Sequence, residues 1–402
     1  MKSVLMIVQN FYPEIGSAGN RMKNVYLNLK RSGYEVTVIT LKPSYPHQSL
    51  YQDAHFWDEV DIEEKDIIRI QPDKVKRYTS NMWRRLLHYL EAMWLFIYTI
   101  IRLEKKYDYV FVTTPPIFPI FAALIAKKKM KAKLITDVRD LWPESLQGVG
   151  VFTNKWILKM AFFLERKIYQ HSNQIIINSP GFRDYILSKG VKSDDIQFIP
   201  NSLTADELNL KKSLPPISEN RIKVVYTGNI GLAQDIKKLI AVAEKLKEHK
   251  QIEFTIIGYG YRMSEVQDEI SSKGLTNIRV IKAMNRRVTL NEVSSSHIAY
   301  VSLVEKDVFD KVLPGKIIDY MCVGKPIVGD VSGRARQVIS EAQCGMVANS
   351  RKVDEISQHI LTMAYEKALR EELGENGHRY AEQNFLWSKN IQGLINVMEA
   401  SS

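Results

Sequence analysis

The start of the chain combines a strand, a glycine-rich loop, a helix and a second strand in close succession. The apolar run Val4–Val8 is continuous, which is typical of a strand buried on both faces of a parallel sheet. A loop with Gly16 and Gly19 follows, a helix is expected over about 20–32, and 36–40 has the composition of the next strand. Such a unit is a right-handed βαβ crossover. The sequence therefore predicts an α/β fold with parallel sheets.

The same arrangement begins again in the second half of the chain. A strand over 223–227 ends in a loop with Asn229 and Gly231, and a strand over 253–257 ends at Gly258 and Gly260. Glycines at these points either admit a ligand or only allow close packing, and the residues leave both open. We predict two Rossmann-like domains facing each other across a cleft. Their expected bounds are 1–202 and 221–386, with a linker over 203–220 and a final helix, about 387–402, packing back on the first domain.

The stretch 313–330 predicts a short helix followed by a buried strand. Pro314 fits the first helical position, Gly315 and Lys316 fall in the opening turn, and Gly324 fits the stop. A helix start with exposed amides, a small residue and a lysine suits a phosphate. Asp319 lies on the same helix face as Lys316, where its carboxylate could accept hydrogen bonds from a ribose diol. The alternative is an ordinary surface helix with a Lys-Asp pair.

Charged residues also follow the strand over 134–138. Arg139, Asp140 and Glu144 come directly after this strand. Active sites of open α/β sheets lie at the carboxyl ends of the strands, so these three are candidate functional residues. Structural ion pairs between arginine and aspartate are the alternative.

Composition limits the class of protein and its partners. Of the 402 residues, 45% are hydrophobic and 25% charged, as in soluble globular proteins. The net charge of +11 favours an anionic partner, which could be nucleic acid, a membrane surface or a phosphorylated ligand. Cys322 and Cys344 form neither a disulfide framework nor a metal-ligand spacing, which indicates a reducing cytoplasm. No metal site is expected.

Two segments bear on a membrane. The apolar run at the N-terminus is short and has no cleavage site after it, so it indicates a first strand and not a signal peptide. The segment 82–101 contains the apolar run AMWLFIYTII, which is too short to span a bilayer, and His88 and Glu91 interrupt the segment before it. It is either an interfacial helix, with Trp83 and Trp94 at headgroup depth, or a helix packed inside the first domain. Basic residues flank it, and 155–169 forms a second basic amphipathic helix; the flanking residues are Lys74, Lys76, Arg77, Arg84, Arg85, Arg102, Lys105 and Lys106.

Six motifs in order make the chain resemble the bacterial glycosyltransferases of family 4, which have the two-domain GT-B fold. They are FYPEIGSAGNR, DVRDLWPES, TGNIGLAQD, GYG, PGKIIDYMCVGKPIV and GENGHRYAEQNF. The nearest branch includes N-acetyl-L-fucosamine transferases of O-antigen and capsule assembly. The resemblance implies transfer of a sugar from a nucleotide donor to a growing glycan, without a metal or other cofactor.

Matched to the family pattern, Asp319 is the second acid of E-x7-E and would bind the donor ribose. The first acid falls at Lys311, so retention of anomeric configuration is left open, and Glu305, Asp307 or Asp310 could substitute. The family's arginine and lysine fall near Asn229 and Gln234, which are uncharged, and Lys316 could supply the lost charge on the diphosphate. Its frequent histidine is replaced by Arg139, which leaves Asp140 or Glu144 as a base for the acceptor hydroxyl.

We therefore expect a transferase that works on the cytoplasmic face of the cell membrane. It would move an N-acetylated amino sugar from a UDP-sugar to an undecaprenyl-diphosphate-linked sugar in capsule, O-antigen or exopolysaccharide synthesis, on an anionic membrane and without nucleic acid. A UDP-sugar epimerase or hydrolase and a non-enzymatic polyanion binder are the alternatives. The expected catalytic residues are Arg139, Asp140 and Glu144; the expected donor-binding residues are Gly16, Gly19, Asn229, Gly231, Gly258, Gly260, Gly315, Lys316 and Asp319.

Overall fold

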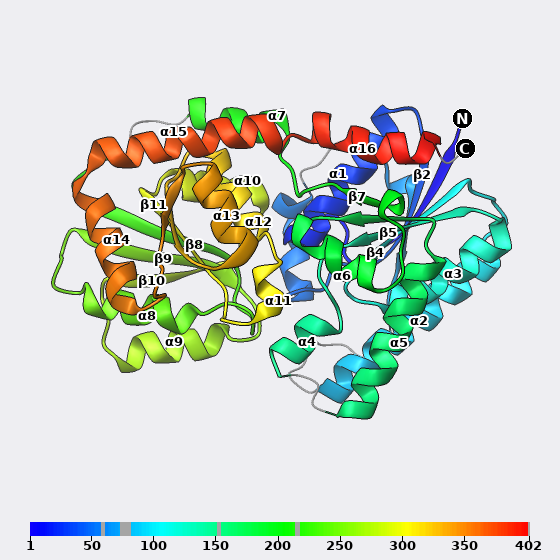
Figure 1. Cartoon of the computed structure of the whole chain (residues 1–402), viewed down its shortest axis with the longest axis horizontal. Coiled ribbons are helices and arrows are strands. Elements are labelled where there is room, and N and C mark those ends of the chain that lie inside the picture. Colours follow the sequence, from blue (N-terminus) through cyan, green and yellow to red (C-terminus); the bar gives the residue numbers. More distant parts are fainter. Residues whose placement is uncertain (58–60, 73–81, 151–153, 214–217, 401–402) are drawn as a thin grey trace. The chain divides into compact units, whose positions relative to one another are not determined.

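The structure is a computed structural model that describes residues 1–57, 61–72, 82–150, 154–213 and 218–400. The side chains of 82–85, 212 and 213 also lie outside the description, so Trp83 and the basic residues expected between 74 and 85 are not placed. The chain forms two compact units, and each contains one parallel sheet (Figure 1). Unit 1 comprises Met1–Pro200 and Trp387–Ser402, and unit 2 comprises Asn201–Leu386.

Unit 1 has a seven-stranded sheet in the order β3-β2-β1-β4-β5-β6-β7. All its neighbouring strands pair in parallel, and the order reverses between β1 and β4. The strands are β1 (Ser3–Ile7), β2 (Glu35–Leu41), β3 (Ile67–Ile70), β4 (Tyr109–Thr114), β5 (Lys133–Val138), β6 (Gln174–Ile177) and β7 (Ile196–Phe198). The α-helices are α1 (Ser17–Arg31), α2 (Met82–Arg102), α3 (Phe118–Met130), α4 (Glu144–Gly148), α5 (Lys155–His171), α6 (Arg183–Ser188) and α16 (Trp387–Ala400).

Unit 2 repeats the architecture with a six-stranded sheet in the order β10-β9-β8-β11-β12-β13. Its strands are also parallel, and the order reverses between β8 and β11. The strands are β8 (Ile222–Asn229), β9 (Ile252–Tyr259), β10 (Ile278–Lys282), β11 (Ile298–Ser302), β12 (Ile327–Asp330) and β13 (Gly345–Val347). The α-helices are α7 (Ala205–Asn209), α8 (Ile236–Lys245), α9 (Met263–Ser272), α10 (Arg286–Ser294), α11 (Asp307–Asp310), α12 (Gly315–Cys322), α13 (Gly333–Glu341), α14 (Val353–Tyr365) and α15 (Lys367–Asn384).

The parallel α/β fold class is confirmed in both halves. The predicted strand at 4–8 is β1, whose residues are all buried because helices cover both faces of the sheet (Figure 1). The final helix, α16, lies in unit 1 against α1 and β7, where Trp387 is buried and the Arg21 guanidinium lies 5.7 Å from the centre of its ring. None of the helices, over the residues that the structure describes, combines the length and apolar character needed to cross a bilayer.

The segment 203–220 was expected to be a linker, but part of it is helical and belongs to unit 2. Its first half folds as α7 and a 3-10 helix, Leu210–Ser213, within unit 2. Thr204 and Glu207 form a capping box, in which each side chain bonds the other residue's backbone N–H. The polar composition that suggested a linker is therefore partly that of a capped helix start. Pro215 and Pro216 lie outside the described residues.

Gly19 also has a different place from the one expected. It lies inside the first turn of α1, not in the loop, while Gly16 is the residue that caps this helix. A Cβ at Gly19 would overlap the carbonyl oxygen of Glu14. Gly19 therefore allows the loop after β1 to pack against α1, which is the structural alternative for these glycines.

Candidate functional site

Lys316 is the central residue of the candidate site in unit 2. It lies in the first turn of α12, which begins directly after Pro314. The Lys316 Nζ is buried and has no hydrogen-bond partner among the described residues. It lies 3.6 Å from the centre of the Tyr226 ring, on β8, and a Cβ on Gly228 would be 3.8 Å from it. A helix start and an unpaired amine thus meet at the carboxyl end of β8, beside the point where the strand order reverses.

Burial changes the charge of this amine. Desolvation lowers the pKa of Lys316 to about 7, and Asp319 raises it by a smaller amount. The ring face of Tyr226 attracts a cation but cannot accept its hydrogen bonds as oxygen would. An anion that brings oxygen acceptors to this position would satisfy the amine and favour its protonated form. Phosphate oxygens are such acceptors.

Asp319 belongs to an ion-pair chain that also includes Arg286 and Glu207. Arg286 Nη2 donates to Asp319 Oδ1 at 2.8 Å, and Arg286 Nε donates to Glu207 Oε1. Burial alone would lower the pKa of Arg286, but Asp319 and Glu207 raise it well above its ordinary value. Neither Arg286 nor Glu207 was expected at this site, because α10 and α7 carried no recognised motif. Lys316 and Asp319 share α12, as the sequence predicted.

The glycine loops of unit 2 have packing roles that the sequence left open. The Asn229 side chain fills the space next to Gly231 and Gly260, so a Cβ at either position would lie within 3 Å of it. A Cβ at Gly258 would meet the Ile230 side chain, in the loop after β8, and the Gly228 carbonyl oxygen on β8. The Gly231 N–H donates to Gln234 Oε1 at 3.0 Å, so that amide is already occupied. The loops after β8 and β9 are therefore held together closely at the edge where Lys316 lies.

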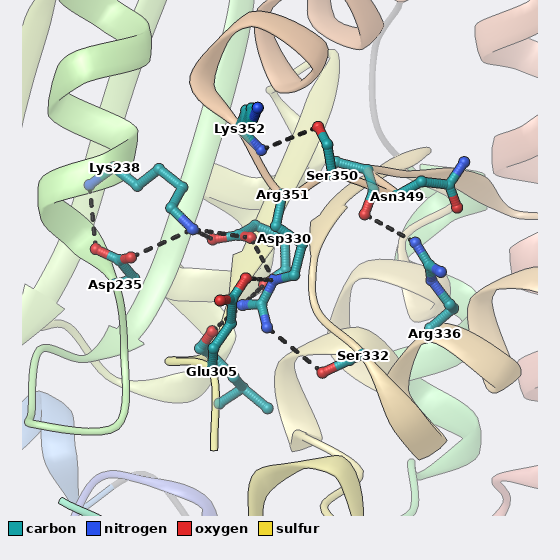
Figure 2. A network of polar contacts seen from close by, with 12 residues as sticks. Asp235, Lys238, Glu305, Asp330, Ser332, Arg336, Asn349, Ser350, Arg351 and Lys352 are labelled. Carbon is teal, nitrogen blue, oxygen red and sulfur yellow. Dashed lines mark hydrogen bonds and ion pairs between the residues drawn. The ribbon is translucent and has the colours of Figure 1, made fainter. Parts of the chain in front are cut away.

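A second buried network, centred on Asp330, lies at the end of β12 (Figure 2). Asp330 is fully buried and receives Arg351 Nε at 2.8 Å and Lys238 Nζ at 3.0 Å (Figure 2). Glu305, one possible substitute for the first acid, lies 3.4 Å from the same arginine, and another, Asp310, accepts from the Ser332 hydroxyl. Arg351 and Lys238 both bond the buried Asp330 carboxylate, so we assign this network to holding the end of β12 in place.

The three candidates in unit 1 lie together after β5. Arg139 donates to Thr113 Oγ1 at 2.8 Å and to the Pro115 carbonyl at 2.6 Å, so it ties the ends of β4 and β5 together. Asp140 Oδ1 is buried with no hydrogen-bond partner among the described residues, and burial raises the pKa of Asp140. Glu144 is the first residue of α4. The arrangement gives Arg139 a structural role and leaves Asp140 as the residue suited to proton transfer.

Glu14 is a further candidate that the sequence did not single out. It lies in the loop after β1, is 6% exposed, and accepts hydrogen bonds from Asn10 Nδ2 at 2.9 Å and the Tyr45 N–H at 3.3 Å. Burial raises its pKa to about 8, and these two bonds lower it less. Glu14 falls within the FYPEIGSAGNR motif, but its burial depends on contacts with the loop after β2, which no local pattern indicates.

Two parallel-sheet units, each with its candidate residues at the carboxyl ends of the strands, have the arrangement of the GT-B fold. Residues 16–202 match the glycosyl transferase 4-like domain and residues 209–380 match the glycosyl transferases group 1, so the chain belongs to these glycosyltransferases. The expectations of a GT-B fold and of a glycosyltransferase are thereby confirmed.

Individual relatives agree with this assignment. The chain is 22% identical over 338 residues to WcaI of Escherichia coli K12, named for glycosyl transfer in colanic acid biosynthesis, covering 80% of this chain and 81% of WcaI. Among solved structures, sucrose-phosphate synthase from Thermosynechococcus elongatus has a TM-score of 0.74 at 14% identity. HepE from Anabaena, in complex with UDP-glucose, has a TM-score of 0.70 at 12% identity. Both structural matches cover 100% of each chain and show the shared fold.

Proposed function

We propose that this glycosyltransferase moves an N-acetylated amino sugar, N-acetyl-L-fucosamine, from its UDP form to an undecaprenyl-diphosphate-linked sugar in capsule, O-antigen or exopolysaccharide synthesis. The observation that carries the donor part is the buried, unpartnered Lys316 Nζ at the start of α12. The UDP-glucose complex of HepE and the polysaccharide pathway in the name of WcaI support the nucleotide donor and the glycan product. The choice of amino sugar comes from the sequence resemblance described above.

The donor chemistry requires stabilisation of a leaving diphosphate. The bond between the anomeric carbon and the diphosphate oxygen breaks, and negative charge builds on that oxygen. Lys316 and the first amides of α12 would bind the diphosphate, and Asp319 would bind the ribose. A helix start contributes only about 0.3–1 kcal/mol, so the lysine charge is the larger part. Because Lys316 supplies positive charge once the diphosphate favours its protonated form, the proposal includes no metal ion, and transfer should persist in EDTA.

The acceptor chemistry requires removal of a proton from a sugar hydroxyl. Asp140, at the carboxyl end of β5, is the proposed base, because its Oδ1 has no partner among the described residues and its raised pKa increases its basicity. The new bond joins the acceptor oxygen to the anomeric carbon. Lys311 replaces the family's first acid. Retention or inversion at the anomeric carbon is therefore determined by analysing the product.

The outer faces of two helices in unit 1 favour a membrane surface as the place where the acceptor is met. On α5 the side chains of Trp156, Met160 and Phe163 follow one face and are 79%, 61% and 55% exposed. On α2, which packs against α3, the outward residues Trp94 and Tyr98 are 64% and 51% exposed. Exposed aromatic residues beside lysines suit an anionic bilayer surface.

The decisive experiment is transfer by purified protein. UDP-, GDP- and dTDP-sugars are offered with lipid-diphosphate-linked amino sugars, and products are identified by mass. We expect one UDP-sugar to add its sugar mass, and we expect Lys316→Ala and Asp319→Ala to reduce transfer at least 100-fold. Lys306→Ala removes an exposed lysine ten residues earlier in the chain and should leave the rate unchanged.

Two other results would replace this proposal. Conversion of a UDP-sugar without any lipid would identify an epimerase or hydrolase. Salt-sensitive DNA binding together with no nucleotide binding would identify a polyanion binder.

A further inference from the structure

Arg286 joins Asp319 to a segment outside the motifs. It is the first residue of α10, and Asn285 caps that helix by accepting the Val288 N–H at 2.9 Å. Its Nη2 contacts Asp319 Oδ1 at 2.8 Å, while its Nε contacts Glu207 Oε1. The guanidinium thus donates from two different nitrogens to two carboxylates on different helices.

Glu207 is itself fixed on its other side. Its Oε2 accepts the Thr204 N–H at 2.9 Å, and its own N–H donates to Thr204 Oγ1 at 3.2 Å. Both carboxylate oxygens of Glu207 are therefore engaged, one by the start of α7 and one by Arg286. Through Glu207, Arg286 therefore links the start of α7 to Asp319.

The three charges do not cancel. One guanidinium lies between two carboxylates, so the group keeps one negative charge and Asp319 has its Oδ1 held in place. The side chains of Arg286, Glu207 and Asp319 are 26%, 15% and 27% exposed, so the group is partly accessible to solvent. A carboxylate whose Oδ1 is held by an arginine loses little side-chain entropy when its other oxygen accepts hydrogen bonds from a ligand. Such a carboxylate is well suited to bind the neighbouring hydroxyls of a ribose.

We propose that Arg286 is a positioning residue that orients Asp319 toward the ribose diol of the donor nucleotide, with Glu207 holding Arg286 in place. This inference rests on the proposed function, because it assumes that Asp319 binds ribose. It adds Arg286 and Glu207 to the site and assigns the recognition of the ribose to the ion-pair chain and not to Asp319 alone.

The test compares UDP with 2′,3′-dideoxy-UDP, which lacks the diol but keeps the diphosphate and the base. Binding of both is measured by calorimetry to the full chain and its variants. The unmodified protein should prefer UDP. In Arg286→Gln the affinity for UDP should fall about tenfold while that for dideoxy-UDP stays the same, so the preference disappears. Asp319→Asn should do the same, and the double variant should be no weaker than Asp319→Asn alone.

Control variants separate positioning from structure. Arg287→Gln removes the exposed neighbour on the same helix and should keep the preference for UDP. Arg286→Lys should retain only part of the preference for UDP, since an ammonium group lacks the planar fork that contacts both carboxylates. Glu207→Gln keeps the packing of α7 and should lower the affinity for UDP by a smaller factor than Arg286→Gln does. This variant serves as the test if Arg286→Gln does not fold.

Three outcomes are distinguishable from the expected one. Equal loss of UDP and dideoxy-UDP binding in Arg286→Gln, or additive losses in the double variant, would overturn the positioning role. If Asp319→Asn keeps the preference for UDP, the ribose contact is wrong and the inference fails with it, although diphosphate binding through Lys316 stands. If the unmodified protein binds neither nucleotide, the proposed function itself fails.

Discussion

At the scale of single residues, Lys316 makes nucleotide binding depend on pH. Its pKa of about 7 leaves the amine partly neutral at neutral pH, and a diphosphate beside Nζ would raise that pKa. The protonated form binds better, so the complex must take up a proton when the free amine has lost it. We expect UDP affinity to fall from pH 7.5 to 9, approaching tenfold per unit. The second phosphate ionisation, near pH 6, lies below this range.

Calorimetry in buffers of different ionisation enthalpy measures the proton uptake directly. The groups that act on the amine are the Tyr226 ring and, from its own helix, the Asp319 carboxylate, which is paired with Arg286 on α10. Lys316→Met should bind UDP weakly at every pH and show no uptake. A flat affinity of the unmodified protein across this range would show that Lys316 stays charged in the free protein.

Glu14 gives a second pH prediction, which concerns stability. Its pKa in the folded protein is raised from 4.5 to about 8 by burial. Between these values the unfolded chain ionises while the folded protein stays neutral, so this group lowers the free energy of unfolding as pH rises from 4.5 to 8. Glu14→Gln removes the effect. Its stability relative to the unmodified protein should therefore rise between pH 5 and 8.5, by an amount on the order of a few kcal/mol.

Urea unfolding at both pH values measures this difference. Gln keeps an acceptor for Asn10 and the Tyr45 N–H, so the packing is preserved. The exposed Glu248→Gln, at 77% side-chain exposure, should show no such trend. A constant difference between Glu14→Gln and the unmodified protein would mean that Glu14 is ionised when folded.

At the scale of elements, the position of α12 depends on a close approach to α15. A Cβ at Gly374 in α15 would overlap the carbonyl oxygen of Gly324, just after α12. Gly374→Ala should lower the free energy of unfolding by about 1–3 kcal/mol, because overpacking exceeds the helical preference for Ala of about 1 kcal/mol. Urea unfolding measures it, with Glu371→Ala on the exposed side as control. Unchanged stability would show that the helices separate without cost.

At the scale of the whole molecule, the net charge of +11 and the exposed faces of α2 and α5 predict binding to anionic liposomes. Replacing Trp156, Met160 and Phe163 together by Ser should reduce cosedimentation at least tenfold, since each buried aromatic or apolar side chain contributes about 1–3 kcal/mol. Neutral liposomes serve as the control for charge, and unfolding curves verify the fold. Recovery of the unmodified protein in the supernatant would rule out docking.

The sequence by itself determined the fold class, the order of strands and helices, and the helix that carries Lys316 and Asp319. These features follow from local patterns: continuous apolar runs, glycine stops, and two residues on one helix face. Only the tertiary structure decided that Arg286 pairs with both Asp319 and Glu207, that Glu14 is buried, and that 203–213 belongs to unit 2. Burial and ion pairing depend on contacts between segments distant in the chain, and no periodicity within one segment records which distant residue will be its partner.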